Sequence, residues 1–373
     1  MNLNKKNIGI LRGGQGDNYE NSIKQGGDLI LHLFENFSEK IQVHDILVDQ
    51  SPSLTPPYTY IWHINGLPII PADLFKKVDL IWNLAHPSLS QILKDFSVPS
   101  ISGGIFSGNS NESRENLKYH MKNIGVNMPR HVLLPAYCFQ GQTLKKSQRS
   151  DLGNSLTPQE YAFEKARQIF EKFGAPWIIH LSPALNPTPT LPEGEGVNLI
   201  SRDAGIYVAK TFVELVNGIK DGISHKQSIL IEELISGKNI STHAVSNFRN
   251  QGTYIFPFHT SLALHKEAPE DLEKFNATDF FKGQTLRTQK GLTLEKIDCE
   301  NLAKNIHQHL DMPPYLKLDF ILNPTRGIFL NNINFTPDLK KDSHFHQSCE
   351  SVGAKVDHVL EAMLKVRTSG IKN

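Results

Sequence analysis

Short apolar runs alternate with helix-spaced segments over the first hundred residues. Apolar runs lie at residues 7–11, 43–48, 78–82 and 98–101, and helical spacing covers residues 19–37 and 89–96. A short continuous apolar run predicts a buried strand, and apolar residues every three or four positions predict an amphipathic helix. Strands that alternate with helices are typical of a parallel, doubly wound α/β sheet. The pattern predicts an N-terminal α/β domain that ends near residue 107.

The rest of the chain contains both kinds of pattern, the apolar runs that predict strands and the spacing that predicts helices. Helices are expected at residues 110–125, 157–173, 204–218, 294–310 and 352–366. Strands are expected at residues 131–134, 175–182, 197–201, 228–234, 240–248 and as a pair within residues 315–335. Pro158 at the first turn of the second helix supports that start, because proline is tolerated where the helix needs no N–H donor.

Composition narrows the classes of function. A chain of 373 residues is long enough for two or three domains, each with its own core. Lys and Arg total 39 against 38 acids, so no strong overall charge favours nucleic acid or a membrane as partner. The three cysteines are widely separated, which disfavours a disulfide framework or a zinc site. With no apolar stretch long enough for a signal peptide or a membrane span, we expect a cytoplasmic protein.

The strand pair near the C-terminal end carries the clearest candidate chemistry. Its two apolar strands are joined by an Asn-Pro-x-x-Gly turn, which predicts a hairpin. Asp319 lies in the first strand, and Asn332 and Asn334 alternate along the second, so both amides share one face. Oxygen-bearing side chains of this kind suit a hard cation such as Mg²⁺. A buried carboxylate needs a partner, and a cation, Lys317 or Arg326 would each satisfy Asp319.

Five motifs follow one another along the chain in a recognisable order. They are Ile8-Gly-Ile-Leu-Arg-Gly-Gly14 with Glu-Asn-Ser after it, Trp82-Asn-Leu-Ala-His86, the strand from Phe173 to His180, Ile229-Leu-Ile-Glu-Glu-Leu-Ile-Ser-Gly237, and the segment from Asp319 to Pro337. In this order they resemble the motifs of the D-alanine:D-alanine ligases, a family of the ATP-grasp superfamily. The resemblance covers most of the chain, which makes it more specific than any single motif.

The resemblance implies a fold and a reaction. The fold is α/β and α+β: an N-terminal parallel-sheet domain at residues 1–107, a central ATP-grasp subdomain at 108–228, and a C-terminal subdomain with the metal motif at 229–373. ATP and Mg²⁺ are the implied cofactors, and D-alanine or another small amino acid is the implied substrate. In the family an acyl phosphate is formed and then attacked by a second amine, which makes a peptidoglycan precursor. A homodimer is the expected assembly if the chain self-associates.

The resemblance also implies roles for individual residues. Catalytic and substrate-binding roles fall on Glu20, Ser22, His86, Lys317 and Ser343. Nucleotide-binding roles fall on Arg114, His180, Glu232, Glu233, Leu234 and Asn239. Metal-binding roles fall on Asp319, Asn332 and Asn334. Glu20 matches the acid that holds the ammonium group of the first substrate, and the backbone of Glu233 and Leu234 is expected to bracket a purine amine.

Several of these positions depart from the family pattern. Arg114 and His180 stand where the family has two ATP-binding lysines, and Asn332 replaces a metal-binding glutamate. Histidine is mostly neutral at pH 7, and an amide carries no charge, so phosphate and metal should both be held weakly. Asn239 replaces a ribose-binding glutamate, and Asp338 replaces a glycine in the substrate pocket.

The departures leave three functions open: an impaired ligase, a pseudoenzyme that acts as a binding or scaffold protein, and a ligase for a different acid.

Structural explanations for several individual residues also stay open. Glu20 and Ser22 suit the start of any helix. The glycines of residues 192–197 favour a surface loop over a phosphate-binding flap. His344 and His346 form a weak metal candidate because no further ligand stands at a suitable spacing.

Overall fold

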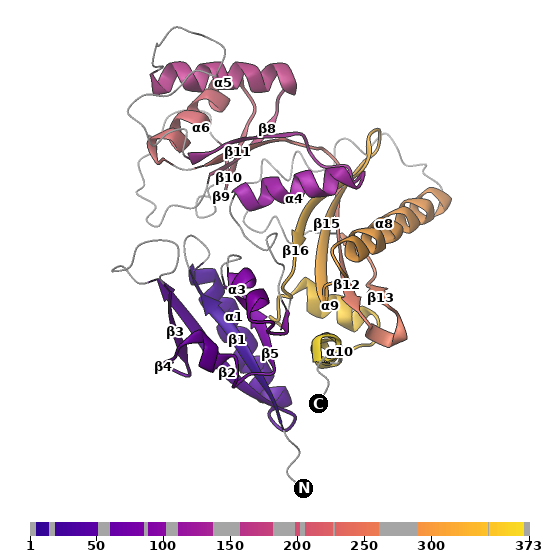
Figure 1. The fold of residues 1–373 in the computed structure, drawn as a ribbon. Helices are drawn as coiled ribbons and strands as arrows, with labels where there is room; N and C mark the ends of the chain where they lie inside the picture. The colour runs from indigo at the N-terminus through magenta and orange to yellow at the C-terminus, as the bar shows by residue number, and fades with distance from the viewer. Residues whose placement is uncertain are drawn as a thin grey trace.

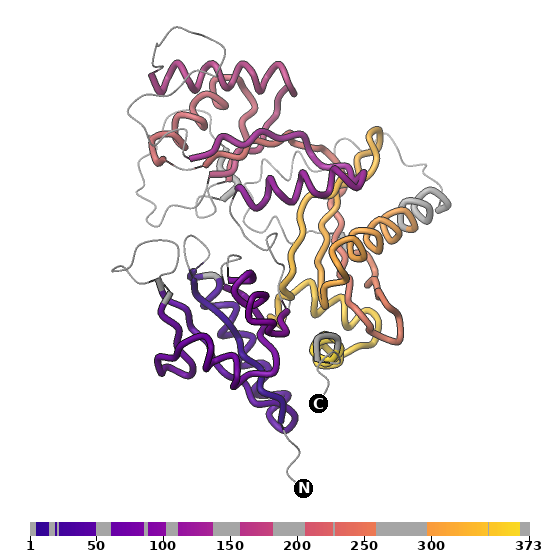
Figure 2. Tube along the Cα trace, in the orientation of Figure 1, coloured from indigo at the N-terminus to yellow at the C-terminus, as the bar shows by residue number. Residues whose placement is uncertain are grey.

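The protein is described by a computed structural model. It describes residues 5–14, 19–50, 60–85, 89–101, 111–136, 157–181, 198–201, 206–226, 228–260, 289–341 and 343–368. Within these residues the strands form three sheets, which the ribbon in Figure 1 shows as three separate groups of arrows. The trace in Figure 2 follows the chain from the N-terminal sheet, through the second sheet, to the third sheet and the C-terminal helices.

The N-terminal sheet has the strand order β4-β3-β2-β1-β5-β6. Its strands are β1 (Lys6–Gly13), β2 (Ile41–Gln50), β3 (Tyr60–Ile64), β4 (Leu67–Pro68), β5 (Leu80–Asn83) and β6 (Ser100–Ile101). Pairs among β1, β2, β5 and β6 are parallel, which confirms the predicted parallel sheet, whereas β3 and β4 add an antiparallel edge that was not predicted. Its helices are α1 (Tyr19–Phe37), α2 (Pro71–Leu74) and α3 (Leu89–Asp95).

Both faces of strand β1 are buried, which explains its continuous apolar sequence. Ile8 and Ile10 pack on one side in a cluster with Leu33 of α1, and Leu11 packs on the other side with Ile46 of β2. The first of these clusters also includes residues of the C-terminal helix, Val359 and Leu360 among them. One core therefore joins the N-terminal sheet to the last part of the chain.

The second sheet has the order β7-β11-β8-β10-β9, with antiparallel pairing throughout. Its strands are β7 (His131–Leu134), β8 (Trp177–Leu181), β9 (Asn198–Ser201), β10 (Ile206–Ala209) and β11 (Ile229–Glu233). Helices α5 (Pro158–Lys172) and α6 (Phe212–Ser224) pack on it in one core. Because β11 pairs in this sheet, the sheet extends beyond residue 228, where we placed the division between the second and third parts.

The prediction of one helix over residues 204–218 is wrong. The segment first runs as strand β10, paired with β8, and α6 begins only at Phe212. A capping box fixes this start: the Thr211 hydroxyl accepts the N–H of Glu214, and the Glu214 carboxylate accepts the N–H of Thr211. These two bonds satisfy N–H groups that the first helical turn leaves without partners.

The third sheet has the order β13-β12-β15-β16, and β14 also pairs with β12. Its strands are β12 (Lys238–Ser246), β13 (Thr253–Ile255), β14 (His259–Thr260), β15 (Tyr315–Asn323) and β16 (Gly327–Asn334). A short 3-10 helix, η4 (Phe248–Asn250), connects β12 to β13. Helices α4 (Asn111–Asn123) and α8 (Gln289–His309) bury one face of this sheet. The opposite face of β12, β15 and β16 carries the polar residues of the candidate site.

The predicted hairpin is confirmed, since β15 and β16 pair antiparallel. The residues of its turn explain the turn's geometry. The Asn323 side chain accepts the backbone N–H groups of Thr325 and Arg326, and Gly327 follows with a φ of 87°. An asparagine that bonds to its own backbone two residues on stabilises such a turn, and glycine tolerates positive φ.

The chain ends in two helices, α9 (His344–Ser351) and α10 (Val356–Thr368), where the pattern predicted one at residues 352–366. Gly353 has a φ of 66° and separates them. Cys299 and Cys349 are free and buried, and Cys138 lies outside the described residues. No helix in the described part of the chain is long and apolar enough to span a membrane.

Candidate functional site

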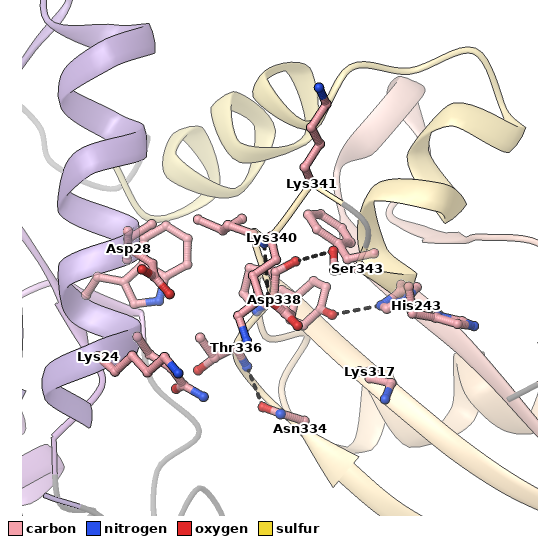
Figure 3. Close-up of a pocket in the computed structure, with 18 residues that line it drawn as sticks. Lys24, Asp28, His243, Lys317, Asn334, Thr336, Asp338, Lys340, Lys341 and Ser343 are labelled. Atoms are coloured by element: carbon pink, nitrogen blue, oxygen red, sulfur yellow. Dashed lines mark hydrogen bonds between the residues drawn. The ribbon is translucent and has the colours of Figure 1, made fainter. Parts of the chain in front are cut away.

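A pocket of about 610 Å³ lies between helix α1 and the loop that follows β16 (Figure 3). Lys24 and Asp28 reach it from α1, and Figure 3 shows them facing the loop that carries Asp338. Its lining includes four lysines and two aspartates: Lys24, Lys317, Lys340, Lys341, Asp28 and Asp338. The Lys341 side chain points away from the others in Figure 3. The pocket therefore offers groups of both signs, with an excess of cations.

Two rows of polar side chains cross the face of the third sheet that lies opposite α4 and α8, next to this pocket. Strand register sets Asp319 of β15 opposite Ser241 of β12 and Asn332 of β16. The next row sets Lys317 opposite His243 and Asn334. These six residues share a face because paired residues point the same way and successive ones alternate. The predicted convergence of Asp319 and the two amides is thus present in the register.

The buried carboxylate of Asp319 is satisfied by the protein itself. The side chain is only 8% exposed, and its Oδ1 accepts a hydrogen bond from the hydroxyl of Ser241, which is fully buried. Lys317 Nζ lies 3.2 Å from the same oxygen, and that lysine is 25% exposed. Of the three partners expected for Asp319, the structure shows Lys317, whereas Arg326 lies beside Glu233.

The two amides contribute little to a metal site. Asn332 and Asn334 are both exposed, and the Asn334 side-chain oxygen accepts the N–H of Thr336 at 2.9 Å. Among the described residues, Lys317 and Asn334 line the pocket, and Asp319 does not. The same part of the chain contains no group of three His, Cys, Asp or Glu side chains that could hold a metal ion.

The residues present do not fit Mg²⁺. Asp319, the one carboxylate among the three predicted metal ligands, is already balanced by the ammonium group of Lys317. At a separation of about 4 Å and an effective dielectric constant of about 20, a divalent cation and an ammonium repel each other by roughly 8 kcal/mol. Asn332 supplies no second negative charge to offset this repulsion.

Behind Lys317, a buried chain of hydrogen bonds joins three aromatic side chains. His243 Nδ1 lies 2.7 Å from the Tyr315 hydroxyl, and His243 Nε2 lies 2.8 Å from His344 Nδ1. Burial raises the pKa of Tyr315 well above its ordinary value, so its hydroxyl stays protonated. We assign the proton donation as Tyr315 to His243 to His344. The sequence offered one signal for this chain, a histidine within the apolar run at residues 240–248.

The second sheet carries a buried ionic network around Glu232. Lys118 Nζ lies 2.7 Å from Glu232 Oε1, and His180 Nε2 lies 3.1 Å from Oε2. Arg114 donates to His180 Nδ1 at 3.0 Å. Burial opposes ionisation of Glu232, but the positive charge of Lys118 and the hydrogen bonds outweigh it and hold the Glu232 pKa far below its ordinary value. Burial lowers the pKa of His180 despite Glu232, which leaves its ring neutral and able to accept from Arg114.

This network brings together three of the predicted nucleotide residues, Arg114, His180 and Glu232. It also includes Lys118, which the sequence reasoning missed. The available signal was helical spacing, since Lys118 stands four residues after Arg114 and residues at that spacing lie on one helix face. Burial also lowers the pKa of Arg114, against the charge of Glu232.

Glu233 belongs to a different network from its neighbour in sequence. Its carboxylate accepts hydrogen bonds from Arg130 at 2.8 and 2.9 Å and also from Arg326. Burial opposes ionisation, but these two guanidinium groups lower the pKa of Glu233 to about 2. The backbone N–H of Glu233 donates to the carbonyl oxygen of Arg130, and the N–H of Leu234 donates to the carbonyl oxygen of Pro176. Asn239 is half-buried on β12, opposite Ile321.

The remaining predicted residues divide into two groups. Ser343 lines the pocket, where its hydroxyl donates to the carbonyl of Asp338 at 2.7 Å and accepts the N–H of His346 to start α9. Glu20 is exposed in the first turn of α1, and buried Ser22 accepts the N–H of Gly13 at 2.9 Å. Neither lines the pocket within the described residues.

Two predictions fall on residues that the structure does not describe, His86 and the glycines of residues 192–197. The weak metal candidate of His344 and His346 gains no support. His344 lies beside His243, and His346 pairs with Glu350 on its own helix at 3.3 Å.

Known structures share this architecture. D-alanyl-alanine synthetase A from Vibrio cholerae matches with a TM-score of 0.62 at 14% identity, over 98% of this chain and 99% of that one. At that identity the match shows the fold. The chain therefore has the ATP-grasp fold, with the N-terminal parallel sheet that the sequence predicted.

The sequence comparisons narrow the class further. Residues 202–365 match the family described as D-ala D-ala ligase C-terminus. The D-alanine–D-alanine ligase of Halalkalibacterium halodurans is 23% identical over 54% of this chain and 67% of its own length. That of Aeromonas salmonicida is 25% identical over 43% of this chain, and the match spans about half of the relative, 48%. The family model and the two relatives point to the D-alanine–D-alanine ligase family, which confirms the resemblance.

Proposed function

We propose that this protein is an ATP-dependent carboxylate–amine ligase of the D-alanine–D-alanine ligase type, with weakened nucleotide and metal chemistry. The observation that carries the proposal is the pocket, because it brings Lys317 and Ser343, two of the predicted catalytic residues, opposite helix α1. The family relationship supports ligase chemistry on small amino acids. D-alanine is the proposed substrate, and peptidoglycan precursor synthesis is the proposed process.

The charges in the pocket suit a zwitterion such as an amino acid. The ammonium groups of Lys24 and Lys317 attract a carboxylate, while Asp28 and Asp338 attract an amine. Ser343 fixes the loop that holds Asp338, through the hydrogen bond to the Asp338 carbonyl. Such fixed groups lower the entropic cost of aligning two reactants, which is a large part of catalysis in ligation. Glu20 does not line this pocket, and its role as ammonium partner of the first substrate is proposed from the resemblance alone.

The nucleotide positions fit ATP only in part. Arg114 is partly exposed and supplies a positive charge for phosphate, but His180 is neutral and bonded to Glu232. The N–H groups of Glu233 and Leu234 already donate to backbone carbonyls, so neither is free to donate to a ring nitrogen of a purine. A purine amine is itself a donor and would need a carbonyl oxygen of this strand end as its acceptor. ATP, when bound, supplies the phosphoryl group that activates the carboxylate. We therefore expect nucleotide binding that is weak and depends little on Mg²⁺.

A second function is favoured by the ion pair between Lys317 and Asp319. Because that pair leaves no fit for Mg²⁺, a protein that binds a small amino acid without turning over ATP is the alternative. It would act as a binding or scaffold subunit. For either function we propose a cytoplasmic location, no nucleic-acid partner, and a homodimer as the assembly to test.

Phosphate release separates the two functions. Purified protein is incubated with ATP, Mg²⁺ and D-alanine, and phosphate is measured against a control without D-alanine. Release that depends on D-alanine supports the ligase. No release, together with a D-alanine-dependent rise in melting temperature, supports the binding protein, because a ligand that binds only the folded state stabilises it. The absence of both results contradicts both functions.

A further inference from the structure

The ion pair of Lys317 and Asp319 has a buried side and an open side. Its anchor is buried, since Ser241 and Asp319 are enclosed and both Ser241 and Lys317 contact the same carboxylate oxygen. Its cation is 25% exposed and lines the pocket. Figure 3 shows Lys317 on β15, on the same side of the pocket as Asn334. The positive charge is therefore held from behind by a carboxylate and meets the pocket in front.

A metal ion in a ligand site is likewise held by protein groups on one side and exposed to the ligand on the other. A carboxylate holds it in the protein, and its open positions take the oxygens of a ligand. An ammonium group also attracts oxygens and has three N–H donors, more than the contact with Asp319 uses. Lys24 and Lys340 add positive charge to the same pocket.

We propose that the ammonium group of Lys317 takes the place of a divalent cation and makes this pocket a metal-independent site for an oxyanion, the carboxylate or phosphate group of a small ligand. The inference rests on the proposed function in taking the pocket as the substrate site. It does not require turnover of ATP. Asp319 acts here as a positioning residue that keeps the Lys317 ammonium at the pocket wall.

The probe is inorganic phosphate, followed by ³¹P NMR at low salt, once with EDTA and once with Mg²⁺. We expect the same affinity in both buffers. Lys317→Met should weaken binding about tenfold or more, because a hydrogen bond to a charged group is lost. Lys317→Arg keeps the positive charge and should retain most of the affinity. Lys355→Met removes an exposed lysine between α9 and α10 and serves as the matched control, which should bind as the wild type does.

Asp319→Asn gives the clearest distinction between a bound metal ion and the Lys317 ammonium as the group that binds phosphate. If a metal held by Asp319 binds the phosphate, this change abolishes binding. If Lys317 binds it, most of the affinity is kept, because the amide oxygen can still accept a hydrogen bond from the Lys317 ammonium and a negative charge beside the site is removed. The side chain keeps its shape, and a melting curve checks that the variant folds. Should it not fold, Asn332→Asp tests the same point, since a second carboxylate should make phosphate binding depend on Mg²⁺ for the first time.

The source of the oxyanion follows from competition. Displacement of phosphate by D-alanine assigns the site to an amino acid carboxylate, and independent binding assigns it to a phosphate group; both results support the site. Phosphate binding that needs Mg²⁺, that is unaffected by Lys317→Met, or that is absent from both buffers overturns the inference. None of these three results decides whether the protein is a ligase, which is tested separately by phosphate release from ATP.

Discussion

Two buried carboxylates of this protein each pair with a lysine, but the two lysines differ in their exposure to solvent. Glu232 of the second sheet is enclosed with its cation, since the Lys118 side chain is 5% exposed. Asp319 of the third sheet is enclosed as well, but the Lys317 side chain is 25% exposed and lines a pocket. At both places a lysine of the chain neutralises a carboxylate that the resemblance assigns to ligand binding. We call Lys118 and Glu232 the closed pair, because both side chains are buried and contribute to stability only. We call Lys317 and Asp319 the open pair, because the lysine remains accessible to a ligand.

The largest expected effect is the loss of the closed pair. Lys118→Met leaves Glu232 charged and buried without its main partner, which should lower the free energy of unfolding by about 3–5 kcal/mol. Urea unfolding at pH 7 measures the change. Lys76→Met is the matched control, because the ion pair of Lys76 with Asp73 is exposed and its loss should cost under about 0.5 kcal/mol. Similar losses in the two variants would show that Glu232 does not depend on Lys118.

The next effect is acid destabilisation through Glu233. Its pKa is lowered from 4.5 to about 2, so the stabilisation is complete above pH 4.5 and is lost as the pH falls toward 2. The shift corresponds to at most about 3 kcal/mol, since one pKa unit is about 1.4 kcal/mol. Urea unfolding at pH 5 and at pH 3 should show the loss, and Glu233→Gln should reduce it. An equal loss in wild type and variant would assign the acid sensitivity to other groups, Glu232 first.

The smallest of the three effects is the loss of the open cation. Lys317→Met should lower the free energy of unfolding by about 1–2 kcal/mol, because Ser241 still donates to Asp319 and water reaches the site. The control is again Lys355→Met, at an exposed position. If Lys317→Met costs as much as Lys118→Met, the two sites are equally closed and the distinction between them fails.

The fold was largely predictable because its signals are local. Apolar runs indicated the four parallel strands of the N-terminal sheet, and the Asn323 turn indicated the hairpin that carries Asp319. One wrong prediction and one helix that was not predicted also have local causes. The capping residue Thr211 starts α6 after strand β10, within the segment where the apolar pattern predicts one helix. Gly353 separates the predicted helix, α10, from the shorter α9 before it.

The site was less predictable because its partners are distant in sequence. Lys317 as partner of Asp319 follows from strand alternation, since the two residues are two positions apart and share a face. Lys118 and Glu232 are 114 positions apart, and Arg326 and Glu233 are 93 apart, so only the packing of separate sheets and helices brings them together. His243 and His344 meet in the same way, across two elements that the pattern did not connect.

The central claim is the proposal that the ammonium group of Lys317 takes the place of a divalent cation in this protein. Its most direct test is a calorimetric titration of ATP into the wild type, with Mg²⁺ and with EDTA, beside the variant that joins Asn332→Glu and His180→Lys. The account predicts weak binding by the wild type in both buffers, and a Mg²⁺-dependent gain in the variant, because each change adds a charge that the phosphate–metal assembly lacks. Tight binding by the wild type that requires Mg²⁺ would contradict the account.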